Sequence, residues 1–514
     1  MKRRDFMKRA LASSLAMTAG GFSLIQSGKV RAQTGYDGTL LFLIDATGAW
    51  EPVDFCDPLK QPGDHPYVAA GTRDEYIINQ ELLHQSTDGP LVDGRFVTYE
   101  RGDLFEYVTN SGQTLRFAPK VNAAGAPIGP YTVGAAGYEM NFFQTYLDDM
   151  MLIKGINTRT NSHAVGQRQA WSGTTRVGFP SIGAMWAAVQ EDVLGAPMAM
   201  TFSSTGGYDA TAGLLSAARA SQKAGLVDLT DLYAWAPSDP EGGQKLYSDY
   251  LLNHVLDYQN ERTNRLLNSQ LPPHVRNNVE KLQAARLAES NFQFLADALE
   301  EVDSTMPGQF IDHSSIVQAS TLVAAMKAGI CTSAMLNLGG FDTHSNHYAA
   351  HPNRLETLFN AAHYVIQQLM AHGLWQRTVL VIGSDFGRTR LNGGAQGKDH
   401  WPTTSYIVMG QGIGGGRSVG YTYIRDIDYT STNPDPPLIA SRGTHHGGLR
   451  EESGTLVDAP VEMISTGEAF ALEPAHIHYA LRDLLGMNAH PYADLFGLPM
   501  DITAQGVKPL FVGS

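Results

Sequence analysis

Residues 40–48 read LLFLIDATG, and this stretch decides the fold class of the chain. The continuous apolar run from Leu40 to Ile44 is typical of a strand that is buried on both faces. The run stops abruptly at Asp45, and the small and polar residues up to Gly48 predict a loop directly after the strand. Strands buried in this way belong to parallel sheets that are covered by helices.

Further apolar strands and helical stretches alternate along most of the chain. Strands are predicted at 150–153, 198–202, 333–338, 379–382 and 406–409. Helices are predicted at 162–171, 181–194, 314–328, 354–371 and 475–485, with Ser181 as an N-cap. This alternation indicates an α/β domain with a doubly wound, mostly parallel sheet and helices on both faces.

Two segments interrupt the alternation and are predicted to be insertions. About 57–138 is rich in Gly, Pro, Asp and Tyr without a helical period, so loops and short strands are expected there. About 242–302 contains two polar-faced helical stretches broken at Pro272 and Pro273, which indicates a helical insertion. The expected organisation is a single domain over 33–514 that carries both insertions.

The first 32 residues resemble a twin-arginine export signal. Arg3 and Arg4 precede Phe6, an apolar stretch runs over 10–25, and Val30-Arg31-Ala32 offers small residues for cleavage after Ala32. A membrane anchor is the alternative, although the apolar stretch is short and rich in Gly, Ser and Thr. The prediction is a signal peptide at 1–32, passage through the twin-arginine translocase, and a periplasmic or extracellular protein without stable membrane insertion.

The charge of the chain limits the classes of partner. Removal of the signal peptide leaves 30 of the 37 basic residues and 50 of the 51 acidic residues, a net charge of −20. This disfavours nucleic acid and anionic membrane as the main partner, while a small anionic substrate is compatible with local arginines or metal ions. The two cysteines, Cys56 and Cys331, provide neither a disulfide framework nor a metal site.

Polar clusters follow four of the predicted strands, and ligands of open α/β sheets bind at the carboxyl ends of strands. The clusters are Asp45 with Glu51, Asn161-Ser162-His163, Asp342 to His347, and Ser384 to Thr389, with a fifth at 398–401 in a Gly-rich loop. Asp, Glu and His without Cys form the ligand set of a hydrolytic metal site, and two metals suit phosphoryl or sulfuryl transfer.

The strongest of these clusters is the one from Asp342 to His347. It places Asp342, His344 and His347 within six residues behind a strand. Simpler roles remain open elsewhere, because Asp45 and Ser162 are also favoured turn and cap residues, and His163 has the alternative of a surface position.

Taken together, the motifs resemble a large bacterial family, domain of unknown function 1501, over nearly the whole mature chain. The motifs are the leader, GAWEP at 48–52 with CDP at 56–58, Ser162-His163, GGFDTH at 339–344, SDFGRT at 384–389 and DHW at 399–401. The family is similar to the alkaline phosphatase superfamily, which includes sulfatases. The resemblance implies an alkaline-phosphatase-like α/β core with a bimetallic site.

The resemblance also assigns roles to individual residues. Asp45 matches the carboxylate after the first strand, and Ser162 matches the nucleophile that opens a helix. Asp342 with His347, or with His344 at a shorter spacing, resembles the pair that holds one metal. Asp385 resembles the carboxylate of the second metal, and His400 the histidine that returns to the first.

Two positions depart from the superfamily pattern. Phe386 stands where a histidine usually follows Asp385, so the site holds one metal or recruits His163. Relatives often carry Asp where this chain has Glu51, which leaves Asp45 and Glu51 as alternatives for the first-strand ligand. Arg388 is the candidate anion clamp, with Arg159 as a second choice.

The sequence therefore predicts an exported metal-dependent hydrolase of phosphate or sulfate esters, with Ser162 as nucleophile. The expected cofactor is a divalent metal, one or two ions, zinc first and manganese, calcium or magnesium as alternatives. The expected partner is a small anionic ester. A non-catalytic secreted module that binds another exported protein is the alternative function.

Overall fold

The computed structural model describes most of the predicted domain. The described residues are 36–58, 103–134, 137–194, 199–202, 226–227, 313–329, 331–389, 396–423, 444–498 and 508–511, with short pieces between 258 and 302. The predicted signal peptide at 1–32 and most of the predicted helical insertion at 242–302 lie outside the described residues, so both stay predictions.

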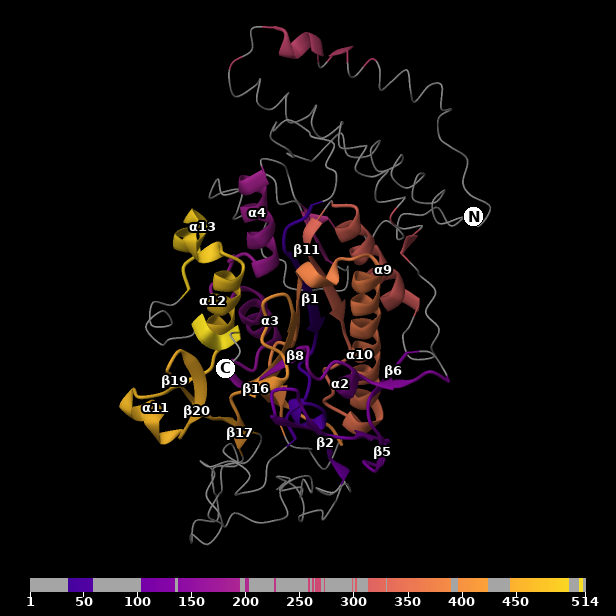
Figure 1. Ribbon diagram of the computed structural model, residues 1–514, viewed down its shortest axis with the longest axis vertical. Coiled ribbons are helices and arrows are strands. Elements are labelled where there is room, and N and C mark those ends of the chain that lie inside the picture. The colour runs from indigo at the N-terminus through magenta and orange to yellow at the C-terminus, as the bar shows by residue number, and fades with distance from the viewer. Residues whose placement is uncertain are drawn as a thin grey trace.

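The centre of the molecule is an eight-stranded sheet with the order β10-β9-β11-β1-β12-β15-β8-β16 (Figure 1). Its strands are β10 (Leu226–Val227), β9 (Ala199–Phe202), β11 (Cys331–Leu338), β1 (Leu40–Ala46), β12 (Thr378–Gly383), β15 (Thr403–Gly410), β8 (Met150–Asn157) and β16 (Arg417–Val419). Among these strands, β15 is antiparallel to β12 and β8, and the other neighbours pair in parallel. The predicted mostly parallel sheet is confirmed.

The predicted strand at 40–44 is β1, in the middle of the sheet. All seven of its residues are buried, and it pairs in parallel with β11 on one side and β12 on the other. Asp45 lies opposite Asn337 of β11 and Gly383 of β12. The carboxyl ends of the three central strands therefore meet at one edge of the sheet.

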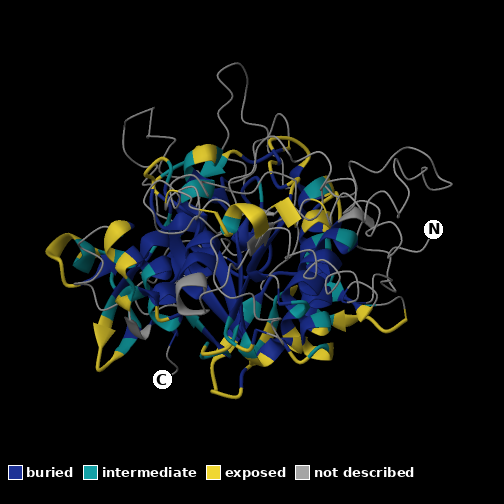
Figure 2. Ribbon diagram, turned by 90° about the horizontal axis from the view of Figure 1, so that it is seen from above, coloured by how far each residue is buried: buried dark blue, intermediate teal, exposed yellow. Residues whose placement is uncertain are grey.

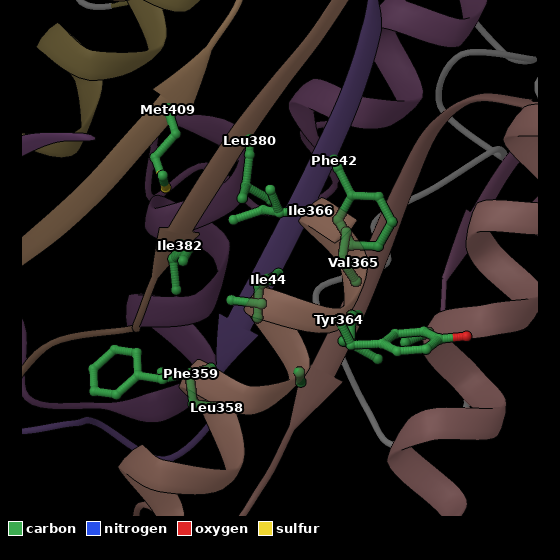
Figure 3. Close-up of a cluster of buried hydrophobic side chains, with 14 of the residues drawn as sticks. Phe42, Ile44, Leu358, Phe359, Tyr364, Val365, Ile366, Leu380, Ile382 and Met409 are labelled. Carbon is green, nitrogen blue, oxygen red and sulfur yellow. The ribbon is translucent and has the colours of Figure 1, made fainter. Parts of the chain in front are cut away.

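Helices cover both faces of the sheet, as predicted. Phe42 and Ile44 point to the face that packs against α9 (His313–Lys327) and α10 (His347–Ala371). Figure 3 shows this packing, in which Ile44 lies among side chains of α10 and of the neighbouring strands. Leu41 and Leu43 point to the opposite face, against α3 (His163–Ser172), α4 (Ile182–Leu194) and α12 (Pro474–Leu484).

The buried residues fill the space between these layers, and exposed residues lie at the periphery (Figure 2). Because each strand buries alternate side chains against a different helical layer, continuous apolar runs are required, and this is why residues 40–44 could be read directly as a core strand. In the part of the chain that the structure describes, there is no helix of the length and hydropathy that crossing a membrane requires.

The described part of the 57–138 segment contains short strands joined by turns and loops. They are β2 (Phe105–Val108), β3 (Thr114–Phe117), β4 (Lys120–Val121), β5 (Pro127–Gly129) and β6 (Thr132–Val133), followed by β7 (Met140–Asn141) and α2 (Phe142–Thr145). The other short elements are η1 (Pro52–Asp54), η4 (Trp375–Arg377), β13 (Gly387–Arg388), β14 (His400–Trp401), β17 (Thr422–Tyr423), β18 (His445–His446), β19 (Gly448–Glu452), β20 (Thr455–Ala459), α11 (Glu462–Thr466), β21 (Phe470–Ala471), η5 (Met487–Ala489), α13 (Pro491–Leu495) and η7 (Lys508–Phe511).

One helix boundary bears on the site. The predicted helix at 354–371 is α10, which begins at His347 and continues through Pro352. His347 is therefore a helix residue and not part of the loop that carries Asp342 and His344.

Candidate metal centre

The strand-end residues predicted from the sequence gather at the carboxyl edge of the central strands. The loop after β11 carries Asp342 and His344, β12 leads directly to Asp385, and β8 leads to the N-terminus of α3 at His163. His400 joins them because the antiparallel strand β15 starts at this same edge, just after His400. Because β15 runs antiparallel to its neighbours, His400 lies before its strand and still reaches the edge at which the other strands end.

Three imidazole rings surround the carboxylate of Asp342. From its Oδ1 atom, the Nε2 atoms of His344, His163 and His400 lie at 3.0, 3.4 and 3.4 Å. The two Nε2 atoms of His344 and His400 are 2.9 Å apart. The ligand atoms of His163, Asp342 and His400 lie within 4.8 Å of one another, as do those of His344, Asp399 and His400, so the two groups share His400. Imidazole nitrogens and carboxylate oxygens are the donor set of a metal site.

The proton of His163 is placed by its contact with Asp385. Nδ1 of His163 lies 2.5 Å from Oδ2 of Asp385, so Nδ1–H donates to the carboxylate and Nε2 keeps its lone pair. This Nε2 atom is buried and has no hydrogen-bond partner. The bond to Asp385 raises the pKa of His163. A carboxylate that holds the far nitrogen of a histidine is the usual support of a metal-binding imidazole.

His400 is fixed in the same way by a backbone carbonyl. Its Nδ1 lies 2.6 Å from the carbonyl oxygen of Asn161, which can only accept, so the proton is on Nδ1. The lone pair of His400 is thereby on Nε2, the atom that faces His344 and Asp342. The short bond between the two Nε2 atoms is then donated by His344, whose proton a cation at this point would replace.

Asp342 also pairs with a buried guanidinium. Nη2 of Arg388 lies 2.5 Å from Oδ1 of Asp342. Burial alone would raise the pKa of Asp342, but the hydrogen bond and charge of Arg388 outweigh it, and the pKa is lowered to about 2. The carboxylate is therefore ionised over the whole physiological range.

Most donors of Arg388 are engaged with the protein itself. Nε donates to the carbonyl oxygen of Ala49 at 2.9 Å, Nη1 to that of Lys398 at 3.2 Å, and Nη2 also donates to that of Gly48. The side chain is fully buried. This geometry makes Arg388 a support for Asp342, and its predicted role as an anion clamp stays a prediction. Arg159 is exposed and pairs with Glu473.

Asp45 and Asp385 form a second acidic position behind the imidazoles. Asp45 is fully buried; its Oδ2 accepts from Oγ1 of Thr47 at 2.8 Å, and its Oδ1 has no partner. Burial and the nearby Asp385 raise the pKa of Asp45 to about 7. Both oxygens of Asp385 are engaged, Oδ1 by Oγ of Ser384 at 2.9 Å and Oδ2 by His163, so a second ion held by Asp45 and Asp385 stays a prediction.

Ser162 occupies the N-cap position of α3 without acting as a cap. Its side chain is exposed and makes no capping bond, while its carbonyl accepts from the amides of Val165 and Gly166. Its neighbours Asn161 and His163 both contact the metal centre. The structure therefore shows no capping hydrogen bond that would support the alternative role of Ser162 as a helix cap, and its hydroxyl is available to a ligand.

The predicted residues Glu51 and His347 lie elsewhere, in a buried polar cluster that we call the Lys398 cluster. It consists of Glu51, Asp54, His347, His351 and Lys398, each at most 6% exposed. Nε2 of His347 lies 2.6 Å from Oδ2 of Asp54. Of the two histidines weighed as the partner of Asp342, it is thus His344 that the structure places beside it.

Three residues of these sites were not among the predicted ligands. They are Asp54 and His351 of the Lys398 cluster, and Asp399, whose Oδ1 lies 3.7 Å from Nδ1 of His344. The spacing of His347 and His351, one helical turn apart, would have indicated from the sequence that the two side chains lie together, but only once the start of α10 was known.

Comparisons with known proteins give remote structural likenesses. Three of them are the lipoteichoic acid synthase LtaP from Listeria monocytogenes (8% identity, 89% of this chain and 92% of that chain, TM-score 0.29), a protein in the alkaline phosphatase superfamily from Vibrio parahaemolyticus (8%, 82% and 72%, 0.26) and the phosphonate monoester hydrolase SpPMH from Silicibacter pomeroyi (12%, 54% and 64%, 0.21). These TM-scores are low, and the fold described above rests on this chain's own strand order and register.

No curated protein matches the chain. A family model described as "Protein of unknown function (DUF1501)" matches residues 135–424, which is more than half of the chain and includes β8, β11, β12 and all four side chains that converge at the centre. The chain therefore belongs to the DUF1501 family, as its motifs predicted.

Proposed function

We propose that this protein is an exported, metal-dependent hydrolase of phosphate or sulfate esters. The observation that carries the proposal is the convergence of three Nε2 atoms on Oδ1 of Asp342, with the protons of His163 and His400 held on the far side of each ring. An exposed serine hydroxyl stands beside these ligands. This combination of donors and nucleophile suits ester hydrolysis better than simple structural support.

His163, His344, His400 and Asp342 would hold the metal. Three imidazole nitrogens and one carboxylate oxygen favour zinc over the alternatives manganese, calcium and magnesium, which prefer oxygen ligands. Asp45 and Asp385 are the residues for a second ion. A divalent cation at this place supplies positive charge for a phosphoryl or sulfuryl group and lowers the pKa of a nearby hydroxyl.

Ser162 is the proposed nucleophile. Its Oγ would bond to phosphorus or sulfur as the ester P–O or S–O bond breaks, and the proton lost by the serine would end on the leaving alcohol. Water would then attack the phosphoryl or sulfuryl group, release the acid and return a proton to the serine. The substrate is a small anionic ester. A twin-arginine leader at 1–32 would deliver the folded protein to the periplasm or beyond, with its metal already bound.

Phe386 is the observation that favours a second candidate function. This fully buried ring stacks on His163 and lies 4.8 Å from both His163 and His400, ring centre to ring centre. It takes the chain position of a ligand in related enzymes. The second candidate is a secreted module that keeps the metal for stability and binds another exported protein.

The test is metal analysis of protein purified from its export route, with assays on aryl phosphates and aryl sulfates. We expect at least one tightly bound divalent metal per chain, lost in Asp342→Ala and kept in Asp148→Ala, an exposed aspartate away from the centre. Ser162→Ala should abolish activity while metal content and unfolding temperature stay unchanged.

The outcomes separate the two candidates. If the purified protein contains no metal and chelators do not change its stability, both candidate functions are contradicted. Bound metal without activity on either ester class favours the secreted module. Activity that survives Ser162→Ala removes the serine from the mechanism but leaves the hydrolase.

A further inference from the structure

The Lys398 cluster lies directly behind the metal centre and joins three distant parts of the chain. Glu51 and Asp54 follow β1, His347 and His351 open α10, and Lys398 precedes His400. All five side chains are buried, and the positions of Asp54 and Lys398 are 344 residues apart. Such an assembly of charged groups in a core is costly unless each group is paired.

By composition the cluster looks like a second metal site, because ligand atoms of Asp54, His347 and His351 lie within 4.8 Å of one another. The hydrogen bonds contradict this. The backbone N–H of Glu51 donates to Nε2 of His351 at 3.0 Å, so the proton of the neutral ring is on Nδ1, 3.2 Å from Oδ2 of Asp54. His351 therefore has no lone pair to offer a metal on the side that faces Asp54.

A cation is already built into the cluster. Nζ of Lys398 lies 3.3 Å from Oε2 of Glu51 and 3.5 Å from Oδ1 of Asp54, above the ring of Tyr348. Its ammonium balances buried carboxylates that would otherwise repel each other. The cluster is therefore an ion-pair network that contains its own cation.

The network is tied by backbone bonds to both loops that carry the metal ligands. In loop 342–346, the carbonyl of Thr343 accepts from the amide of Lys398 at 3.0 Å, and Oγ1 of Thr343 lies 2.7 Å from Nδ1 of His347. Thr343 stands between Asp342 and His344. In loop 396–400, the carbonyl of Gln396 accepts from the amide of His347 at 2.7 Å.

We propose that Lys398 is a positioning residue, which holds loops 342–346 and 396–400 together through Glu51 and Asp54 so that the ligands of the centre are in place before any metal binds. Lys398 touches no ligand atom, but it is one residue from Asp399 and two from His400, and it bonds the residue between Asp342 and His344. Groups that orient metal ligands from behind typically contribute a factor of about 10 to 100 to metal affinity.

The test compares Lys398→Met with Lys120→Met. Lys120 pairs with Glu356 on α10 in a largely buried ion pair, away from both loops. Zinc affinity is measured by competition with a chelator, and hydrogen exchange is measured on the metal-free proteins. We expect Lys398→Met to bind zinc about 10 to 100 times more weakly, and Lys120→Met to bind zinc as the wild type does.

Exchange of three amides reports on the loops without any metal. The amides of Lys398, His347 and Thr389 bond to Thr343, Gln396 and Asp399, and in Lys398→Met they should exchange at least about tenfold faster while amides of β1 and β12 do not change. The double variant Asp54→Asn, Lys398→Met removes one buried carboxylate together with the ammonium. It should fold even where the single variant does not, and should show the same loosened loops.

The zinc-affinity measurement rests on the proposed function, because it requires a wild type that binds metal, whereas the exchange measurement does not. If the wild type binds no metal, the proposed function fails, and the exchange experiment still decides the role of Lys398. Folded variants with protected loop amides and zinc affinity within about twofold of the wild type would overturn the positioning role alone. Equal loss of zinc affinity in Lys120→Met would do the same, because it would reduce the effect to general instability.

Discussion

Nδ1 of His163 and Oδ2 of Asp385 lie 2.5 Å apart, and this contact fixes which nitrogen of His163 faces Asp342. Asp385 is fully buried just after β12, and Oγ of Ser384 donates to its Oδ1 at 2.9 Å. The imidazole is thus held from behind in the orientation that a metal ligand requires.

Asp385→Asn should weaken metal binding. The amide keeps the shape of the side chain but accepts a weaker hydrogen bond from Nδ1–H of His163 than a carboxylate does. We expect zinc affinity to fall by about 10 to 100 times, measured by competition with a chelator. Asp148→Asn is the matched control, since Asp148 is exposed and precedes β8, at the end of that strand away from the centre. Equal losses in both variants would contradict a specific role of Asp385.

Arg388→Gln should destabilise the protein and release Asp342. The change leaves the carbonyls of Gly48 and Ala49 without their buried donor, and we expect the free energy of unfolding to fall by about 2–4 kcal/mol. The pKa of Asp342 should rise from about 2 towards its ordinary value of 3.8. Urea unfolding measures the first effect, and carbon-detected NMR titration measures the second.

Arg116→Gln provides the comparison for Arg388. Its pair with Glu106 lies at the surface, so the loss should stay below about 1 kcal/mol. An Arg388→Gln variant as stable as this control would show that the buried guanidinium contributes little to the loop it supports.

The strand-end carboxylates could be predicted because they follow continuous apolar runs. Asp45 lies near the end of β1, and Asp342 and Asp385 come after β11 and β12, the two neighbours of β1 in the sheet, so their convergence follows from parallel pairing alone. His400 was predicted from the polar cluster at 398–401, and the family resemblance assigned its role. The antiparallel direction of β15, which brings His400 to this edge, was not predicted, because a run of apolar residues does not indicate whether the strand pairs parallel or antiparallel with its neighbours.

The Lys398 cluster could not be predicted from local patterns. Its central contact joins Asp54 and Lys398, and no periodicity relates residues that far apart in the chain. The predicted helix begins at residue 354, which leaves His347 in the polar cluster that starts at Asp342. In the structure α10 begins at His347 and continues through Pro352, and Nε2 of His347 contacts Asp54.

His478 should make stability depend on pH below neutrality. It is fully buried, Nε2 donates to the carbonyl oxygen of Ala170 at 2.8 Å, and burial lowers its pKa from 6.5 to about 3. The folded state binds fewer protons than the unfolded state between these values, so its contribution is complete above pH 6.5 and is lost as the pH falls towards 3. The slope contributed by this residue is up to about 1.4 kcal/mol per pH unit.

His478→Gln tests this dependence, because glutamine keeps an N–H donor but does not titrate. The variant should lose less stability than the wild type between pH 6.5 and pH 4, as followed by urea unfolding at each pH. The control variant is His490→Gln, because His490 lies near the surface with its ring against Tyr492. Parallel stability curves for wild type and His478→Gln would contradict the assignment.

Gly397→Ala should separate the two loops that carry the metal ligands. A Cβ atom at Gly397 would overlap the carbonyl group of His344, and both sides of this contact are backbone, so one loop has to move. We expect lower stability and weaker zinc binding together. Gly339→Ala changes the same kind of residue on the strand side of Asp342, where an added Cβ meets no atom within 4 Å, and it should leave both quantities unchanged. If Gly397→Ala lowers stability but not zinc affinity, the close approach of the loops serves folding alone, because the ligands would then keep their places with the loops apart.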